Sequence, residues 1–125
     1  MLFRSALMTP AASLRRSAHE VMLDRDGRVR VQLDSEDRPV GVTLDGNAGA
    51  IAIADRATGE VAARAEDVDI VVAPLDLKMR SAIALRRLSG NPIVLVDDLG
   101  RMAGLCGDDE IYRALLQQRR AAGEA

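Results

Sequence analysis

The chain repeats itself at a spacing of 63 residues, and this periodicity limits the available folds more than any other feature. Two segments of similar pattern, GRVRVQLDSEDRPVGVTLD and GNPIVLVDDLGRMAGLCGD, begin at Gly27 and Gly90. Residues of the same type coincide in one register: Gly27 with Gly90, Val31 with Val94, Leu33 with Val96, Asp34 with Asp97, Arg38 with Arg101, Gly41 with Gly104, and Asp45 with Asp108. A unit of about 60 residues buries little surface by itself. The repeat therefore predicts two similar units that pack against each other.

The second copy carries clear signals for strands and helices. Its uniformly apolar stretch Ile93–Val96 is typical of a strand buried on both faces. Gly90 predicts the end of the preceding helix, and the acids Asp108, Asp109 and Glu110 suit the positive end of the next one. The expected order is a strand at Asp69–Pro74, a helix at Leu77–Ser89, a strand at Ile93–Val96, a turn at Asp97–Arg101, a strand at Met102–Cys106 and a helix from Asp108.

The first copy carries weaker signals. The sequence predicts a helix at Ser13–Leu23 and strands at Val29–Leu33 and Val40–Leu44. By analogy with the second copy, a closing helix is expected over residues 46–57. Two glycines and two isoleucines make that stretch a poor helix. A hairpin of AIAIAD with EVAARA is the rival interpretation, and the sequence leaves both open.

Composition excludes several classes of function. With one Tyr, one Phe, no Trp and a net charge of −2, the chain lacks the stacking surfaces and the basic field of a nucleic-acid-binding protein. No stretch approaches the roughly 20 apolar residues of a membrane span, so we expect no direct membrane insertion. The single cysteine, Cys106, allows no internal disulfide and favours a cytoplasmic location. His19 is the only histidine. Neither a metal cluster nor a catalytic triad is visible, so we expect no metal and no enzymatic activity.

The repeated pattern resembles a known family. The stretches VQLDSEDRPVGVTLDGN and VLVDDLGRMAGLCGDDEIYRALL, each with a predicted helix before it, resemble the CBS domain, whose tandem pairs form Bateman modules. The resemblance implies an α+β fold of two CBS repeats (strand-helix-strand-strand-helix) packed as one module, with repeat 1 in residues 1–58 and repeat 2 in residues 59–125. The chain looks most like the CBS pair of glycine betaine/proline ABC transporter ATPases, although it contains no G-x-x-x-x-G-K-[ST] phosphate loop.

The resemblance also implies a ligand site. CBS pairs bind adenosine-type ligands through a G-x-x-[TS]-x-x-D signature at the last strand–helix junction. Here Leu44 and Gly107 replace the hydroxyl residue, while Asn47 and Glu110 replace the aspartate. The candidate ligand-binding residues are Asn91, Pro92, Asp108, Glu110, Asp45 and Asn47. The simpler interpretation is that the acids cap a helix and that Asp45 and Asn47 form a turn. With no hydroxyl and several acids, the junction suits adenosine or AMP better than ATP.

The expected function is regulatory. The resemblance implies a module that senses an adenosyl ligand or ionic conditions and controls a partner, such as the ATPase subunit of an osmoprotectant ABC transporter. The alternative is a stand-alone CBS protein, acting either as a ligand-binding module or as a ligand-free dimerisation module. CBS modules join through their helices with two-fold symmetry, so a homodimer is expected.

Overall fold

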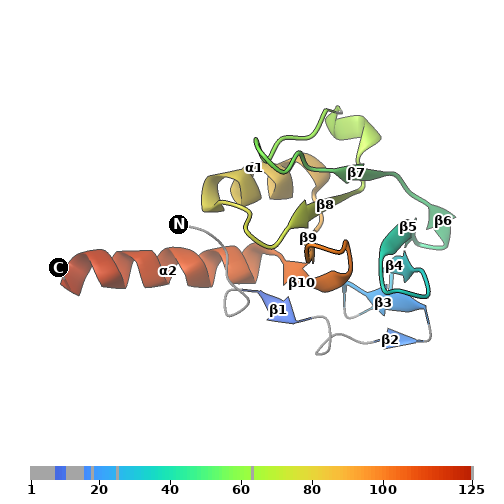
Figure 1. The fold of residues 1–125 in the computed structure, drawn as a ribbon, viewed down its shortest axis with the longest axis horizontal. Coiled ribbons are helices and arrows are strands. Elements are labelled where there is room, and N and C mark those ends of the chain that lie inside the picture. Colours follow the sequence, from blue (N-terminus) through green and yellow to red (C-terminus); the bar gives the residue numbers. More distant parts are fainter. Residues whose placement is uncertain (1–7, 11–15, 18, 25, 63, 125) are drawn as a thin grey trace.

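The computed structural model has three layers, with helices and an antiparallel sheet on opposite faces of a central mixed sheet (Figure 1). It describes residues 8–10, 16–17, 19–24, 26–62 and 64–124. The two sheets have five strands each, and they are built from separate parts of the chain. The class is therefore mixed α+β, as the sequence predicts.

The central sheet has the strand order β1-β10-β9-β8-β7. Its strands are β1 (Thr9–Pro10), β7 (Ile51–Ile53), β8 (Ile70–Pro74), β9 (Ile93–Val96) and β10 (Met102–Cys106). Strands β7, β8 and β9 are parallel, whereas β10 and β1 run antiparallel to their neighbours. Helix α1 (Met79–Ser89) connects β8 to β9, and α2 (Asp108–Glu124) follows β10 and extends beyond the body of the molecule (Figure 1).

The second sheet is an antiparallel meander with the order β2-β3-β4-β5-β6. Its strands are β2 (Arg16–Ser17), β3 (Glu20–Met22), β4 (Val29–Leu33), β5 (Pro39–Leu44) and β6 (Asn47–Ala48). A short 3-10 turn, η3 (Ala65–Asp67), precedes β8.

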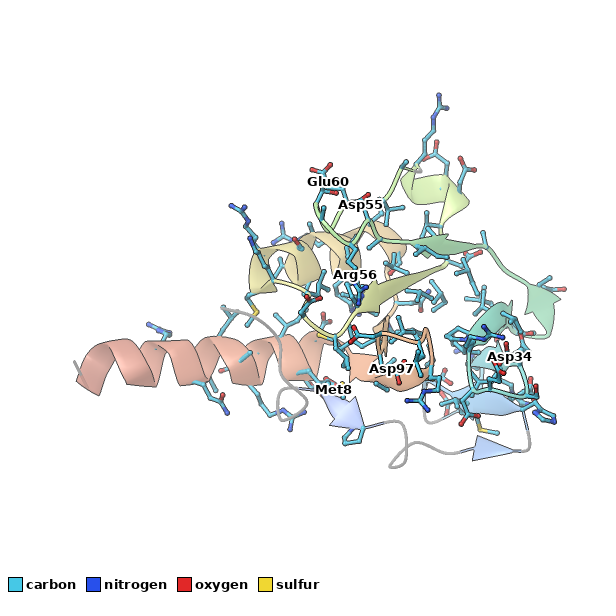
Figure 2. The ribbon with its side chains drawn as sticks, in the orientation of Figure 1. Met8, Asp34, Asp55, Arg56, Glu60 and Asp97 are labelled. Atoms are coloured by element: carbon cyan, nitrogen blue, oxygen red, sulfur yellow. The ribbon has the colours of Figure 1, made fainter. Side chains whose placement is uncertain are left out.

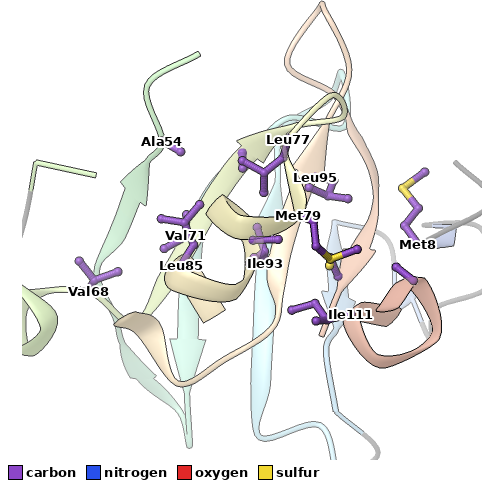
Figure 3. Close-up of a cluster of buried hydrophobic side chains, with 14 residues drawn as sticks. Met8, Ala54, Val68, Val71, Leu77, Met79, Leu85, Ile93, Leu95 and Ile111 are labelled. Carbon is purple, nitrogen blue, oxygen red and sulfur yellow. The ribbon is translucent and has the colours of Figure 1, made fainter. Parts of the chain in front are cut away.

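Alternating side chains of the central sheet supply two hydrophobic cores. Val71 and Leu95 pack with α1 and α2 in one core (Figure 3), while Ile70 and Val94 pack against the antiparallel sheet in the other. The second core takes Val21, Leu23, Val31, Leu33 and Val42 from the antiparallel sheet. Because the central strands are buried on both faces, their sequences are almost wholly apolar.

The repeat is visible as two hairpins with the same register. In the first hairpin, β4 and β5 pair Val31 with Val42, Gln32 with Gly41, and Leu33 with Pro39. In the second, β9 and β10 pair Val94 with Leu105, Leu95 with Gly104, and Val96 with Met102. Each pairing of the second hairpin lies 63 residues after its counterpart, and both hairpins carry the register shift at the same place. The repeat predicted from the sequence thus exists as a duplicated, bulged hairpin.

The turns of the two hairpins also match. Asp34 Oδ1 accepts the N–H groups of Glu36 and Arg38, both at 2.9 Å, and Asp97 Oδ1 accepts those of Leu99 and Arg101 at 2.9 and 3.0 Å. The guanidinium of the last residue then closes on the same carboxylate at 2.9 Å in both turns. Figure 2 shows the two aspartates, one in each hairpin. The Met102 N–H donates to the Asp37 carbonyl at 2.8 Å, so the turn of the first hairpin is joined to the second.

Outside the hairpins, the two copies differ, and two predictions for the first copy are wrong. Within the predicted helix Ser13–Leu23, residues 20–22 form β3, and residues 13–15 and 18 lie outside the described part of the chain. Residues 46–57 form β6 and β7 in place of the expected helix. The rival hairpin of AIAIAD with EVAARA is also wrong, because the strand within AIAIAD, β7, pairs instead with β8, and in parallel. The strand-helix-strand-strand-helix order is therefore absent from the described residues of the first copy.

The elements predicted for the second copy are confirmed. Strands β8, β9 and β10 and helices α1 and α2 lie within one or two residues of their expected bounds. Gly90 ends α1 in the left-handed region, at φ 71°, and its N–H donates to the Arg86 carbonyl.

Candidate functional site

The candidate residues of the second copy lie together at the junction of β10 and α2. The start of β9 lies beside the end of β10, because Ile93 pairs with Cys106. A Cβ placed on Gly107 would meet the Pro92 ring at 3.5 Å and Glu110 Oε2 at 3.8 Å. We call this junction, formed by Asn91, Pro92, Gly107 and Glu110, the α2 corner. The start of β9 and the start of α2 thus lie side by side at this corner.

Glu110 is the buried acid of the α2 corner. It is only 7% exposed, and its Oε1 accepts a hydrogen bond of 3.0 Å from the Thr9 hydroxyl. Strand β1, which carries Thr9, pairs with β10 at Leu105 and Gly104. No local sequence signal indicates this partner, because Thr9 lies 101 residues away. A ligand that used Glu110 would have to displace the Thr9 hydroxyl or share the carboxylate with it.

Asn91 and Asp108 are held by other contacts. The Asn91 side-chain amide donates to the Asp69 carbonyl at 2.8 Å, and its backbone N–H donates to the Ser89 hydroxyl at 3.1 Å. Asp108 is exposed and accepts a hydrogen bond of 3.2 Å from Arg86 Nη2. Asn91 therefore fixes the start of β9 against β8, and Asp108 joins α2 to α1.

The candidate residues of the first copy lie in a tight turn. Asp45 and Gly46 have φ angles of 50° and 84°, and the flanking Leu44 and Asn47 pair across β5 and β6. Two consecutive residues with positive φ are typical of a type I′ hairpin turn, for which Asp-Gly is a preferred sequence. Asp45 also pairs with Arg28 at 3.1 Å, and Asn47 is exposed. These contacts hold Asp45 and Asn47 in their own hairpin and give them the structural role of turn residues.

Cys106 is a core residue beside the α2 corner. It is fully buried, and burial, with Glu110 and Asp108 adding to it, raises the pKa of its thiol to about 12. A thiol in this state is a poor nucleophile at neutral pH. Among the described residues, no group of three or more His, Cys, Asp or Glu side chains is placed to hold a metal ion.

Comparisons with models of protein families, with curated proteins and with solved structures find no match to this chain. Of the helices in the described part of the chain, none is long and apolar enough to span a membrane.

Proposed function

We propose that this chain is a regulatory module of the CBS-pair type, which binds a small adenosyl ligand and acts on a partner protein. The duplicated hairpin carries this proposal: two copies with one register pack against each other through equivalent residues, Val31 and Val42 in one and Val94 and Leu105 in the other. Tandem duplication with mutual packing is the arrangement that the CBS resemblance implies. The α2 corner adds a buried carboxylate beside the start of β9, where a ribose would be held.

The ligand test is a panel of adenosine, AMP, ATP and S-adenosylmethionine, followed by thermal unfolding. A ligand at 100 times its Kd stabilises the folded state by about 2.7 kcal/mol. We expect adenosine or AMP to raise the Tm, and Thr9→Val to strengthen their binding, because that substitution frees Glu110. Glu110→Gln should weaken binding, whereas the matched control Asp109→Asn, at the exposed neighbouring position, should leave it unchanged. If no panel member shifts the Tm of the wild type or of Thr9→Val, the proposed ligand binding is wrong.

The partner we propose is the ATPase subunit of an osmoprotectant ABC transporter, located in the cytoplasm. The test is the rate of ATP hydrolysis by such a subunit with and without the chain, measured as ionic strength is raised. A rate that depends on the chain, with a dependence that changes with salt, supports this partner. Identical rates at all salt concentrations contradict it.

One observation favours the alternative of a dimerisation module. Tyr112 and Leu115, three residues apart on α2, are 64% and 38% exposed. Such exposed apolar pairs on a helix are suited to contact with a second copy. Light scattering should then give twice the mass of the 13.4 kDa chain, and Tyr112→Ser with Leu115→Ser should halve it. A mass near that of one chain at all concentrations excludes the homodimer.

A further inference from the structure

Two adjoining cavities open at the carboxyl ends of the parallel strands β7, β8 and β9. A polar cavity of about 260 Å³ lies between the loop after β7 and the start of α1, and an apolar cavity of about 190 Å³ lies over the strand ends. The two cavities share Arg56 and Pro74 in their walls. Ligands of sheets with parallel strands bind outside the carboxyl ends of those strands. This edge is at the opposite ends of the strands from the α2 corner.

The polar cavity presents groups that bind an anion. Arg56, Lys78 and Arg80 contribute positive charge, and Thr58 and Ser81 contribute hydroxyl donors. Lys78 and Arg80 are exposed; Lys78 is the N-cap residue of α1 and Arg80 lies in its first turn, which contains no acidic residue and receives no side-chain cap from Lys78.

Two acids, Asp55 and Asp76, also line the polar cavity, and their carboxylates have different surroundings. Asp55 accepts the N–H groups of Ala57 and Thr58 at 2.8 and 2.9 Å, and these hydrogen bonds lower the pKa of its carboxyl. The Asp55 carboxylate is therefore engaged by hydrogen bonds within its own loop. Asp76 is exposed on the other side of the cavity. It would weaken the binding of a doubly charged phosphate without preventing it, because Lys78 and Arg80 line the same space and Arg56, although paired with Asp98, lies beside them.

The loop wall of the polar cavity is preformed. The Asp55 N–H donates to the Glu60 carbonyl, and the Gly59 N–H donates to the Asp55 carbonyl, both at 2.8 Å. Gly59 has a φ of 71°, and a Cβ at this position would lie 2.7 Å from Ser81 Oγ. The loop therefore packs closely against α1 at Gly59 and Ser81; Figure 2 labels Asp55, Arg56 and Glu60 of this loop. A ligand would therefore bind against this loop without the entropic cost of ordering it.

The apolar cavity is lined by Ile53, Val72 and Val96, among others. Ile53 is 76% exposed although it lies in a strand of the central sheet. Arg56 lies between the two cavities and pairs with Asp98. The edge thus offers an apolar surface directly beside a basic one.

We propose that this edge binds a small phosphomonoester with an apolar or flat organic part, of the size of a nucleoside monophosphate. The phosphate occupies the polar cavity, where Lys78, Arg80 and the hydroxyl of Ser81 contact it. The organic part lies against Ile53 and Val96. This inference goes beyond the proposed function, because it gives the chain a second ligand site, separate from the α2 corner.

The test is calorimetric titration of the full chain with AMP, inorganic phosphate and adenosine. We expect AMP to bind more tightly than either half-molecule. Lys78→Ala with Arg80→Ala should weaken AMP by about tenfold or more, since hydrogen bonds to charged groups are the strong ones. Asp76→Asn should strengthen AMP binding, and this gain cannot arise from misfolding. The matched control Arg113→Ala, an exposed arginine of α2, should leave the affinity unchanged.

Two outcomes would overturn the inference. If Glu110→Gln abolishes all AMP binding and the Lys78→Ala, Arg80→Ala double variant leaves it unchanged, AMP binds only at the α2 corner, and the proposed function stands without this second site. If neither AMP nor phosphate binds at millimolar concentration while adenosine does, the edge is not a phosphate site, and the proposed function again survives. Weaker binding of AMP and of phosphate in the double variant, with or without an effect of Glu110→Gln, supports the inference.

Discussion

The two hairpins, β4–β5 and β9–β10, share strands, register, bulge and turn, yet they lie in different surroundings. The first has one buried face and one face toward solvent, whereas the second is covered on both faces. At the equivalent positions Gln32 and Leu95, the first hairpin has a half-buried amide that donates to Glu20 at 2.9 Å, and the second has a leucine with no exposed surface. The same hairpin backbone therefore occurs once in the outer antiparallel sheet and once in the central sheet.

The sequences of the two strands account for this difference. VRVQL in β4 alternates apolar and polar residues, and IVLV in β9 is apolar throughout. Alternation is typical of a strand with one solvent face, and continuous apolar sequence is typical of a strand covered on both. Helices cover only the second hairpin because only its outer face offers an apolar surface to them.

The residues after each hairpin decide how the chain continues. Asp45-Gly46 adopts two positive φ angles and turns the chain back into β6. At the equivalent place, the second copy has Asp108-Asp109-Glu110, which form the first turn of α2. Carboxylates stabilise the start of a helix, while glycine permits the reversed turn. Gly46 therefore permits the turn in the first copy, and the acids favour the helix at the equivalent place in the second.

Truncation of the equivalent side chains should give the largest contrast. We expect Leu95→Ala to lower the free energy of unfolding by about 2–5 kcal/mol, because it leaves a cavity beneath α1 (Figure 3). Gln32→Ala should cost about 1 kcal/mol, the contribution of one hydrogen bond at a half-buried position. Urea unfolding of the two variants measures both values. Equal losses would show that the two hairpins are equally buried and would contradict the account.

A methyl group added to the equivalent glycines should give the next largest contrast. A Cβ on Gly104 would lie 2.4 Å from Met8 Sδ and 2.7 Å from the Thr9 carbonyl oxygen, whereas a Cβ on Gly41 would meet only the Gln32 side chain, at 3.2 Å. We expect Gly104→Ala to cost about 1–3 kcal/mol by overpacking. Gly41→Ala should be nearly neutral, because Gln32 is long and can move aside. A neutral Gly104→Ala in thermal unfolding would place β1 elsewhere.

Alanine substitution of the glycine that precedes each hairpin should instead lower the Tm by a similar amount in both copies. Gly27 and Gly90 have φ angles of 67° and 71°. Alanine in this left-handed region costs about 1 kcal/mol, through strain in the folded state. Gly27→Ala and Gly90→Ala should therefore lower the Tm by similar amounts in calorimetry. A loss confined to one of them would mean that the repeat does not extend to this position.

The turn aspartates should give the smallest effect, and again the same effect in both copies. The backbone N–H of Arg38 is the main cause that lowers the pKa of Asp34. For Asp97, the largest single effect is burial, which raises the pKa. The hydrogen bonds from Arg101 and Leu99 together outweigh burial and leave the pKa below its usual value. Both carboxylates thus stabilise the fold above about pH 3.9, the unfolded value, and this stability is lost as pH falls through the lower folded pKa values.

Carboxyl chemical shifts followed through an acid titration measure both pKa values directly. Asp34→Asn and Asp97→Asn should each remove part of the acid-dependent loss of stability. Titration of either aspartate at or above the value of an unfolded chain would contradict the hydrogen-bonded turn.

The elements of the second copy and the β4–β5 hairpin of the first could be predicted from sequence, but the segments on either side of that first hairpin could not. IVLV and the glycine after Ser89 are strong local signals, and the structure follows them. In the first copy, analogy with the second suggested helices, but the alternation of VRVQL and the Leu44-Asp45-Gly46-Asn47 turn already favoured a meander.

In the candidate site, too, some features follow from local sequence pattern and others depend on distant parts of the chain. Asn91, Pro92 and Glu110 come together because strand pairing of β9 with β10 follows from local pattern. The bond from Thr9 to Glu110 depends on the position of β1, which no local signal specifies. The cavities at the carboxyl ends of β7, β8 and β9 depend on the parallel pairing of β7, which the predicted helix over residues 46–57 had excluded.

The most direct test of the account is a backbone NMR assignment of the whole chain. It compares the segments that follow the two hairpins in one sample. We expect extended Cα shifts at residues 47–48 and 51–53, helical shifts from Asp108 onward, and cross-strand amide contacts of Gln32 with Gly41 and of Leu95 with Gly104. Helical shifts across residues 46–57, or different registers in the two hairpins, would contradict it.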